Sequence, residues 1–431
     1  MTKLIIKNGH LIDPVNNIDA RKDIEITNSQ ISAITECSNP TKNDTIIDAS
    51  EMYVFPGLID THVHLREPGE EYKETIETGI VAALKGGITS LCSMPNTHPV
   101  CDNEGIVRYI LEKSHAIGLG KVYPIGAITK NLEGKELSEI GNMKKAGIIA
   151  LSDDGNPVTS SYLLRRAMEY AHTFNLHIID HCEDVTLSAH GVMHEGYFST
   201  ILGLKGIPSS SEEIQVARDI LLSQHTQIPI HIAHLSTRTS VNLIRWAKEN
   251  NIPVTAEVTV HHLLLTDKDL IRYDTNLKVK PPLRSEDDRI ALIEGLSDGT
   301  IDTIVTDHAP HADIDKDLEF DYASFGMIGL ETCFPLLFSS QEIRDKLSLS
   351  KLIQKMTSNP AQIFNIPGGN ASLGTPADLV IFNPTKKVTI DDSFFFSKSR
   401  NTPFMGKVLT GVPCSVIVNG KLVFKDNTII A

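Results

Sequence analysis

The sequence predicts an α/β protein: a (β/α)8 TIM-like barrel with a small β-sandwich domain formed by both chain ends. Short apolar runs alternate with helical stretches through the middle of the chain, whereas strand-like runs without helices occupy both ends. Polar residues gather where the central runs finish. The length of 431 residues suits a barrel of about 250 residues plus a second module.

The two ends of the chain share one pattern. The first fifty residues alternate apolar runs with turn formers, as in LIIKNGHLIDP and DIEITNSQISAIT, which is typical of short strands. The segments ADLVIFNP, CSVIVNG and KLVFKDN repeat it near the other end. Because chain termini often lie close together, we expect the ends to pair. The predicted domains are 1–54 and 366–431 for the β-sandwich and 55–365 for the metal-dependent hydrolase barrel.

Eight strand-like runs lie between these ends: YVFPGLID, ITSLCSM, VYPIGAI, GIIALSD, HIIDH, IPIHIAH, IPVTAEV and DTIVTDH. Their near-continuous apolar character, with helical stretches between them, predicts parallel βαβ units. A doubly wound open sheet is the alternative. In nearly every run, however, a His, Asp or Asn stands at or just past the C-terminal end, where barrel enzymes build their sites. This favours the closed barrel.

Charge and composition exclude several function classes. The net charge of −14 argues against general nucleic-acid binding and against adsorption to anionic membranes, since both need a cationic surface. No signal-like apolar segment opens the chain, and no stretch approaches the roughly 18 apolar residues of a membrane span. Six scattered cysteines without a CxxC pair suggest reduced thiols. We therefore expect a cytoplasmic protein.

Histidines and an aspartate at the strand ends predict a metal site. DTHVHLREPG follows the first barrel run and places His62 and His64 two residues apart, so that both imidazoles lie on one face of an extended strand. An HxH pair alone is a weak signal. His181 ends the fifth run, His234 the sixth, and Asp307 lies near the end of the eighth. Histidines that are buried for structural reasons alone would not gather at the C-terminal ends of several strands. Imidazole and carboxylate are also the ligand types of hydrolytic zinc sites.

Two cations close together need a bridging anion, and the fourth run offers Asp153 and Asp154 at its end. Adjacent strand residues face opposite ways, so we expect one of the two to bridge. We expect His231 and His308 to point away from the metals, with His308 in a supporting hydrogen bond.

Other residues near the strand ends are candidates of a different kind. His261 and His262 follow the seventh run and are weaker ligand candidates. Arg66, two residues past the second histidine and on the same face, can bind a carboxylate through two parallel hydrogen bonds, although a surface arginine is the alternative. Asn96 in MPNT follows the second run and is a candidate for the site by its position. The alternative is that asparagine stands there because its backbone favours a turn.

The sequence resembles the class I bacterial dihydroorotases of the amidohydrolase superfamily. The resemblance is carried by DTHVHLREPGEEYKETIETG, MPNT, SDDGNPV, DHCED, HIAHLSTRTS, KPPLR, TDHAPH, GLET and NPAQIFNIP, which span nearly the whole chain. It implies reversible, zinc-dependent cyclisation of N-carbamoyl-L-aspartate to L-dihydroorotate, a step of de novo pyrimidine (UMP) biosynthesis. Two zinc ions per chain are implied by the same resemblance.

The resemblance also implies a role for each matching residue. A metal-bridging hydroxide would attack the ring amide, with Asp307 as proton shuttle. Lys280 stands where the family usually has the asparagine of NPPLR, so its part in substrate binding is open. The implied ligands are His62, His64 and Asp307 for one zinc, His181 and His234 for the other, and Asp154 as the bridge. The implied substrate contacts are Arg66, Asn96, His311, Phe325 and Gly326.

Two other functions compete with this interpretation. A hydantoinase-like or allantoinase-like cyclic amidase would normally carry a lysine at the fourth-strand bridge, and GIIALSDDG has none. A non-catalytic dihydroorotase-like subunit would have lost ligands, whereas every expected position is filled. We expect a small-molecule substrate, a homodimer and, as a further partner that the resemblance allows, aspartate transcarbamoylase. We expect neither nucleic acid nor a membrane as a partner.

Overall fold

The barrel is built from eight parallel strands, one from each central run of the sequence. The computed structural model describes residues 3–430. The strands are hydrogen-bonded in the order β15-β14-β13-β10-β9-β8-β7-β6, and a parallel bridge between Val63 and His308 joins the last to the first. The prediction of a closed barrel is therefore confirmed. The strands are β6 (Leu58–Val63), β7 (Ile88–Ser93), β8 (Lys121–Gly126), β9 (Ala150–Ser152), β10 (His177–Asp180), β13 (Ile230–Ile232), β14 (Val254–Thr259) and β15 (Thr303–Val305).

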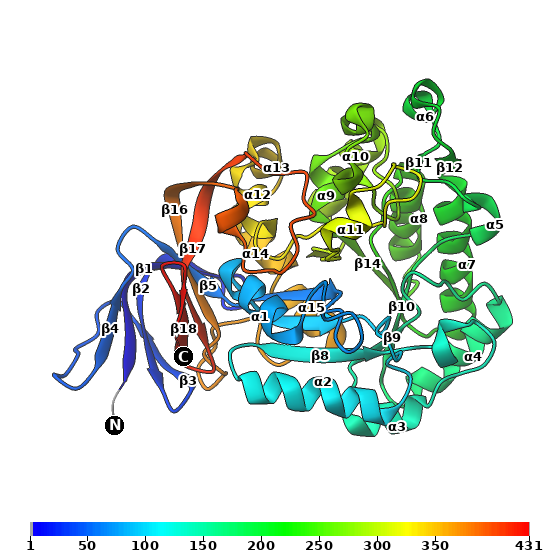
Figure 1. Ribbon diagram of the computed structural model, residues 1–431. Helices are drawn as coiled ribbons and strands as arrows, with labels where there is room; N and C mark the ends of the chain where they lie inside the picture. The colour runs from blue at the N-terminus through cyan, green and yellow to red at the C-terminus, as the bar shows by residue number, and fades with distance from the viewer. Residues whose placement is uncertain (1–2, 431) are drawn as a thin grey trace.

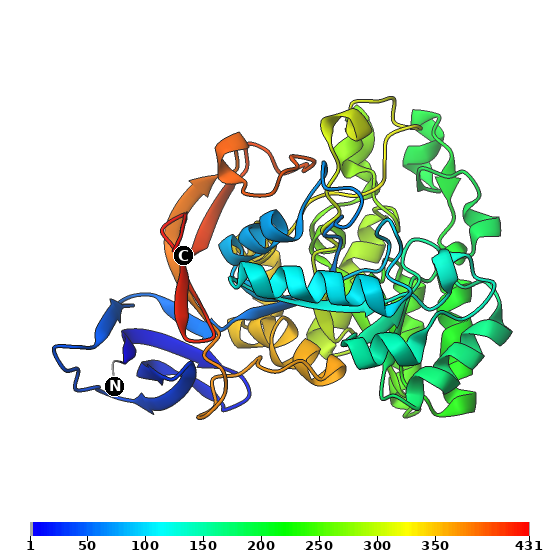
Figure 2. The same cartoon turned by 60° about the horizontal axis from the view of Figure 1, so that its bottom comes forward.

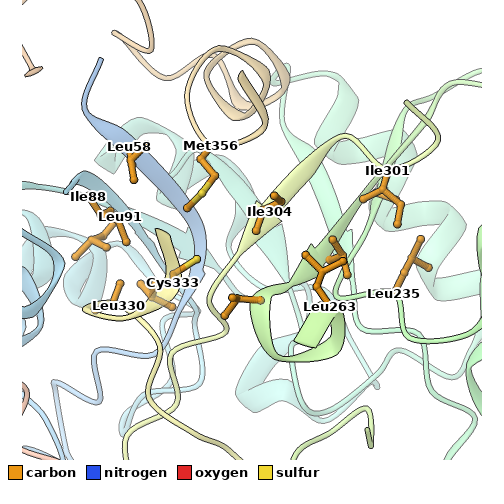
Figure 3. Close-up of a cluster of buried hydrophobic side chains, with 14 of the residues drawn as sticks. Leu58, Ile88, Leu91, Leu235, Leu263, Ile301, Ile304, Leu330, Cys333 and Met356 are labelled. Atoms are coloured by element: carbon orange, nitrogen blue, oxygen red, sulfur yellow. The ribbon is translucent and has the colours of Figure 1, made fainter. Parts of the chain in front are cut away.

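Burial on both faces explains why these strands read as continuous apolar runs. Every residue of β6 and of β7 is buried. Leu58 and Ile88 from these strands belong to the same buried cluster as Ile304 of β15 and Met356, which comes after the last barrel strand in the chain (Figure 3). Parallel strands that are covered on both faces lack the polar alternation of a surface sheet.

Helices alternate with the strands and lie outside them (Figure 1). In α2, Asn103 caps the first turn by accepting hydrogen bonds from the amides of Gly105 and Ile106, and Gly118 ends the helix in the left-handed conformation. The larger helices are α1 (Ile76–Lys85), α2 (Glu104–Ile117), α3 (Ile140–Ala146), α4 (Ser161–His172), α7 (Ser210–Thr226), α8 (Arg238–Glu249), α10 (Glu286–Asp298), α12 (Cys333–Ser339), α13 (Gln341–Lys346), α14 (Leu349–Lys355) and α15 (Ser358–Phe364).

Shorter elements connect the larger ones, and most of them lie in the loops that follow the barrel strands. They are α5 (Val185–Ser188), α6 (Tyr197–Leu202), α9 (Val260–Leu264), α11 (Asp313–Lys316), the strand pair β11 (Met193–His194) and β12 (Gly206–Ile207), and the 3-10 turns η1 (Lys130–Leu132), η2 (Asp267–Arg272), η3 (Thr275–Leu277) and η4 (Asp392–Phe394). None of the helices within residues 3–430 combines the length and the apolar character needed to cross a membrane.

The two chain ends form one nine-stranded sheet beside the barrel (Figures 1 and 2). Its order is β19-β18-β17-β16-β5-β1-β2-β3, with β4 paired to β1. The antiparallel pairing of β5 with β16 joins the two ends, as the sequence predicts. The strands are β1 (Leu4–Asp13), β2 (Ile18–Thr27), β3 (Gln30–Thr35), β4 (Thr45–Asp48), β5 (Tyr53–Pro56), β16 (Leu379–Thr389), β17 (Val408–Val418), β18 (Lys421–Lys425) and β19 (Thr428–Ile429).

A single glycine separates the end sheet from the barrel. The first central run divides at Gly57, so that β5 pairs in the end sheet while β6 enters the barrel. A Cβ atom at Gly57 would lie 2.3 Å from the hydroxyl oxygen of Thr89, which is why the chain passes here without a side chain. The domain boundaries themselves remain predictions.

Glu331 is a buried carboxyl group near the junction between the barrel and the end sheet. Its Oε1 accepts a hydrogen bond of 2.6 Å from the backbone amide of Phe396, and the side chain is almost fully buried. Burial raises the pKa of Glu331 to about 8, against the lowering effects of this amide and of Lys85 nearby. The group therefore keeps its proton in the folded chain at neutral pH.

This raised pKa predicts a pH-dependent loss of stability that Glu331→Gln should reduce. Between about pH 4.5 and about pH 8 the unfolded chain releases the Glu331 proton while the folded chain retains it, so the free energy of unfolding falls as pH rises. Glutamine stays neutral throughout. Urea midpoints at both ends of this window should differ less for the variant than for the original chain. Equal differences would contradict the assignment.

Candidate metal and substrate site

A cavity of about 290 Å³ opens at the C-terminal ends of the barrel strands. Every site residue predicted from the sequence lines it except His62, which lies fully buried beside the others. The lining residues are His64, Arg66, Asn96, Asp154, Gly155, His181, His234, Lys280, Asp307, Ala309, His311, Phe325 and Gly326. Residues from distant parts of the sequence therefore meet in one pocket.

Asp154 lies at the centre of the four imidazoles. Its Oδ1 is 3.3 Å from Nε2 of His62 and 3.3 Å from Nδ1 of His181. The same oxygen is 3.5 Å from Nε2 of His234, and Oδ2 is 3.5 Å from Nε2 of His64. One carboxylate thus faces both pairs of histidines.

Asp307 completes the group on the side of the HxH pair. Its Oδ1 lies 3.2 Å from Nε2 of His64 and 3.7 Å from Nε2 of His62. On the other side, Nδ1 of His181 and Nε2 of His234 are 2.8 Å apart. The backbone of His234 and Asp307 has positive φ, 28° and 48°, an uncommon conformation that aims both side chains inward.

The ligand atoms have the arrangement that a cation requires. His62, His64 and Asp307 each offer an atom within 4.8 Å of the other two, as do His62, Asp154 and His234. Nε2 of His62 and Oδ1 of Asp154 are buried and make no hydrogen bond with the rest of residues 3–430. Buried polar atoms without partners are costly, and a divalent metal would satisfy these two. The donor set fits a metal centre.

Asp153 faces the other way, as expected for the neighbour of an inward-pointing strand residue. Its carboxylate accepts hydrogen bonds from the amides of Ile128 and Thr129, at 2.7 and 3.0 Å, and from the Thr129 hydroxyl. Burial raises the pKa of Asp153 to about 6. This residue fastens the end of β9 to the loop after β8.

Glu257 is a supporting residue that is not among those predicted from the sequence. It lies on β14, fully buried, with Oε1 2.6 Å from Nδ1 of His62 and Oε2 3.2 Å from Nε2 of His231. Burial opposes ionisation, but these two histidines hold the pKa of Glu257 below its usual range. The carboxylate fixes the His62 ring with Nε2 toward Asp154. A glutamate inside the apolar run IPVTAEV was the available signal.

The other histidines occupy supporting positions. His231 also contacts the Thr255 hydroxyl at 2.8 Å, which confirms that it faces away from the centre. His308 is buried, with Nε2 3.4 Å from Glu74, also as predicted. His262 contacts the Thr259 hydroxyl and the Pro281 carbonyl.

His261 is buried, and neither ring nitrogen has a hydrogen-bond partner within residues 3–430. Burial lowers its pKa to about 4, so the ring is neutral.

Arg66 and His311 form a linked pair in the cavity wall. The Arg66 Nε donates to the Pro310 carbonyl at 3.1 Å, and one terminal nitrogen lies 3.3 Å from Nε2 of His311. Nε2 of His311 is also 2.9 Å from the Phe325 carbonyl. Burial lowers the pKa of His311 to about 2, so Arg66 carries the positive charge of the pair.

Asn96, predicted as a substrate contact, also has a structural partner. Its Oδ1 is 2.9 Å from Nδ1 of His64, and a donated bond from this nitrogen directs Nε2 of the ring toward Asp154 and Asp307. The Asn96 side chain also lines the cavity.

Phe325 and Gly326 form another part of the wall. Gly326 has φ 130°, and a Cβ atom there would lie 2.6 Å from that of Ala309, so glycine is needed. Its amide donates to the Lys278 carbonyl at 2.8 Å. Lys280, the position left open by the sequence, forms an ion pair with Glu183 at 2.8 Å.

Comparison with known proteins relates the chain to enzymes that act on cyclic amides. The family described as dihydro-orotase-like matches residues 52–240. The dihydroorotase of Pelotomaculum thermopropionicum is 50% identical over 427 residues, covering 99% of this chain and 100% of that protein. The dihydroorotase of Acetivibrio thermocellus is 48% identical with the same coverage. Among solved structures, an L-hydantoinase (dihydropyrimidinase) from Arthrobacter aurescens superposes with a TM-score of 0.89 at 27% identity, covering 100% of this chain and 98% of that one.

Proposed function

The chain belongs to the dihydroorotase family, and from this premise we propose that it catalyses the reversible cyclisation of N-carbamoyl-L-aspartate to L-dihydroorotate in pyrimidine biosynthesis. The observation that carries the proposal is that Arg66 lines the same cavity as the cluster around Asp154. A cyclic amide that bears a free carboxylate needs a cationic side chain to bind the carboxylate and a metal centre to activate the ring amide. Arg66 and the cluster around Asp154 would provide the two.

The proposed cofactor is zinc, with two ions per chain. His62, His64 and Asp307 would hold one ion and His181 and His234 the other, with Asp154 between them. When bound, divalent zinc polarises a carbonyl and lowers the pKa of water to near neutrality. Glu257 and Asn96 orient the rings of His62 and His64 toward this centre.

Asp307 is the proposed proton carrier. It lines the cavity next to His64, where its carboxylate can take a proton from attacking water and return it to the leaving ring nitrogen. In the cyclisation direction the same carboxylate would accept the proton of the carbamoyl nitrogen. Arg66, Asn96 and His311 would bind the substrate carboxylate, while Phe325 and Gly326 would border the ring.

Assays of metal content and of two substrates test this function. The purified protein is expected to contain about two zinc ions per chain and to hydrolyse L-dihydroorotate much faster than hydantoin. Carbamoyl aspartate should form from dihydroorotate, and the reverse reaction should be measurable at lower pH. A zinc-replete protein that turned over hydantoin but not dihydroorotate would overturn the substrate assignment. A zinc-replete protein with neither activity would favour a non-catalytic subunit.

Substitution of Arg66 should weaken substrate binding. Loss of a hydrogen-bonded ion pair of about 1.5–3 kcal/mol predicts that Arg66→Ala raises the KM for dihydroorotate by about 10-fold to 100-fold. Arg66→Lys should recover only part of this loss, because an ammonium cannot make two parallel bonds. Steady-state kinetics with both variants measure the effect, and an unchanged KM in Arg66→Ala would contradict the carboxylate assignment.

Substitution of Glu257 should weaken the metal centre without touching substrate. Loss of a carboxylate that orients a ligand histidine typically costs about 10-fold to 100-fold in metal affinity, and we expect this for Glu257→Gln. Competition with a chromophoric zinc chelator measures it. Glu249→Gln on the exposed surface of α8 is the matched control and should bind zinc as the original chain does.

The quaternary state is a separate proposal. We expect a homodimer and, as a second assembly, a complex with aspartate transcarbamoylase. Light scattering on the purified chain, alone and with that enzyme, tests both. Cytoplasmic localisation likewise stays a prediction from the sequence.

A further inference from the structure

Lys280 links the wall of the cavity to a buried carboxylate. It follows η3 in the chain, and its Nζ lies 2.8 Å from Oε1 of Glu183 and 5.6 Å from the centre of the Phe325 ring. The Lys280 side chain is 31% exposed, whereas that of Glu183 is 6% exposed. Within residues 3–430, no donor is aligned for a hydrogen bond with Oε1 of Glu183, so the contact between Lys280 and Glu183 is an ion pair without a hydrogen bond.

The other oxygen of Glu183 holds His181. Oε2 lies 3.1 Å from Nε2 of the imidazole. A carboxylate only accepts hydrogen bonds, so Nε2 carries the proton and Nδ1 presents a lone pair. That lone pair faces Oδ1 of Asp154 at 3.3 Å and Nε2 of His234 at 2.8 Å. Glu183 therefore fixes the tautomer of His181 that can ligate a metal.

Within residues 3–430, Lys280 is the only lysine or arginine in ion-pair contact with Glu183. Arg284 lines a second, smaller pocket together with Glu183 and Lys280, but its guanidinium makes its hydrogen bonds to other residues. Its Nε donates to the Ser236 hydroxyl at 3.0 Å, and a terminal nitrogen donates to the Ile207 carbonyl at 3.0 Å. Removing Lys280 would leave the Glu183 carboxylate buried without a counter-ion, an arrangement that favours rotation of the side chain toward water.

We propose that Lys280 is a positioning residue of the metal centre: its ammonium holds the Glu183 carboxylate, which in turn directs Nδ1 of His181 toward the metal. The inference rests on the proposed ligand set and deepens it. The His62 and His64 rings are held by Glu257 and Asn96 instead. Lys280 therefore affects only the metal ion that His181 would bind, and not the ion of His62 and His64. With its ammonium committed to Glu183, Lys280 contributes little to substrate affinity.

Zinc titration of the metal-free protein tests the inference without any substrate. Lys280→Met is expected to weaken one of the two zinc ions by about 10-fold or more while the other keeps its affinity. Lys280→Arg, which keeps the charge, should bind both ions nearly as the original chain does. Lys268→Met, at an exposed lysine of η2, is the matched control and should change neither. Cobalt absorption spectra of each variant report whether the altered site keeps its geometry.

A second variant separates this role from a general loss of folding. Glu183→Gln should weaken the same zinc ion, and adding Lys280→Met to it should cause little further loss, because both act through one contact. Unchanged zinc affinity in Lys280→Met with a raised KM for dihydroorotate would overturn the inference and make Lys280 a substrate contact. Additive losses in the double variant would also overturn it. If the original chain bound no zinc, the proposed centre would fall and this inference with it, whereas zinc binding without dihydroorotase activity would overturn only the proposed substrate.

Discussion

Asp154→Ala is expected to remove both zinc ions and all measurable turnover. Asp154 is the carboxylate within 3.5 Å of all four histidines, so its loss leaves the two ions without the shared negative charge that offsets their repulsion. Loss of a direct ligand should exceed the effect of about 10-fold to 100-fold expected for supporting residues. Elemental analysis after dialysis and a dihydroorotate assay measure the outcome.

Asp153→Asn is the matched control for this variant because it changes the adjacent aspartate on the same strand. Its side chain accepts hydrogen bonds from Ile128 and Thr129 and faces away from the centre. The control should keep its zinc but lose about 1–3 kcal/mol of stability, since buried donors lose a charged acceptor. Circular dichroism should show both variants folded. Full zinc content in Asp154→Ala would contradict the bridging role.

Strand periodicity explains how much of this site the sequence predicts. A spacing of two residues places His62 and His64 on one face of β6, and adjacency forces Asp153 and Asp154 onto opposite faces of β9. These are local constraints that any extended strand obeys. The closed barrel then brings the C-terminal ends of β6, β9, β10, β13 and β15 to one mouth, so the ligand positions follow from strand order.

The supporting contacts were harder to predict because they join residues far apart in the sequence. Glu257 on β14 meets His62 on β6 only because the barrel closes through β15, and Lys280 meets Glu183 through a loop whose path no local pattern describes. The sequence predicts Asn96 as a substrate contact, yet the side-chain oxygen of Asn96 also lies 2.9 Å from Nδ1 of His64. Side-chain partners of this kind depend on barrel closure and on loop packing, so composition and spacing say little about them.

The division of the first central run into β5 and β6 also depends on contacts between residues far apart in the sequence. YVFPGLID reads as one strand by its apolar content, but Tyr53–Pro56 pairs with β16 and Leu58–Val63 with β7. Gly57 follows Pro56, and a Pro-Gly pair is typical of a break between two strands. Gly57 is required because Thr89 of the neighbouring strand approaches its Cα closely, which becomes apparent only once the barrel is assembled.

Asp307→Asn is expected to lower kcat for dihydroorotate by about 10²-fold to 10⁴-fold, the usual contribution of a positioned acid or base. The amide keeps the shape of the side chain and an oxygen that can face His64, where Asp307 now lies at 3.2 Å, but it cannot accept and return a proton at neutral pH. Zinc should therefore remain largely bound, and binding of carbamoyl aspartate should persist because Arg66 and His311 are intact.

The contrast between the two variants identifies the role of each aspartate. Asp154→Ala should lose metal and activity together, whereas Asp307→Asn should lose activity while most of its zinc remains. Zinc content, carbamoyl aspartate binding and kcat measured on the same preparation separate the two cases. If Asp307→Asn lost its zinc as completely as Asp154→Ala, then Asp307 would act chiefly as a ligand. If Asp307→Asn kept more than about a tenth of the original kcat, the proposed proton role of Asp307 would be wrong. The loss in kcat would then be smaller than the roughly 10²-fold that a positioned acid or base contributes at least.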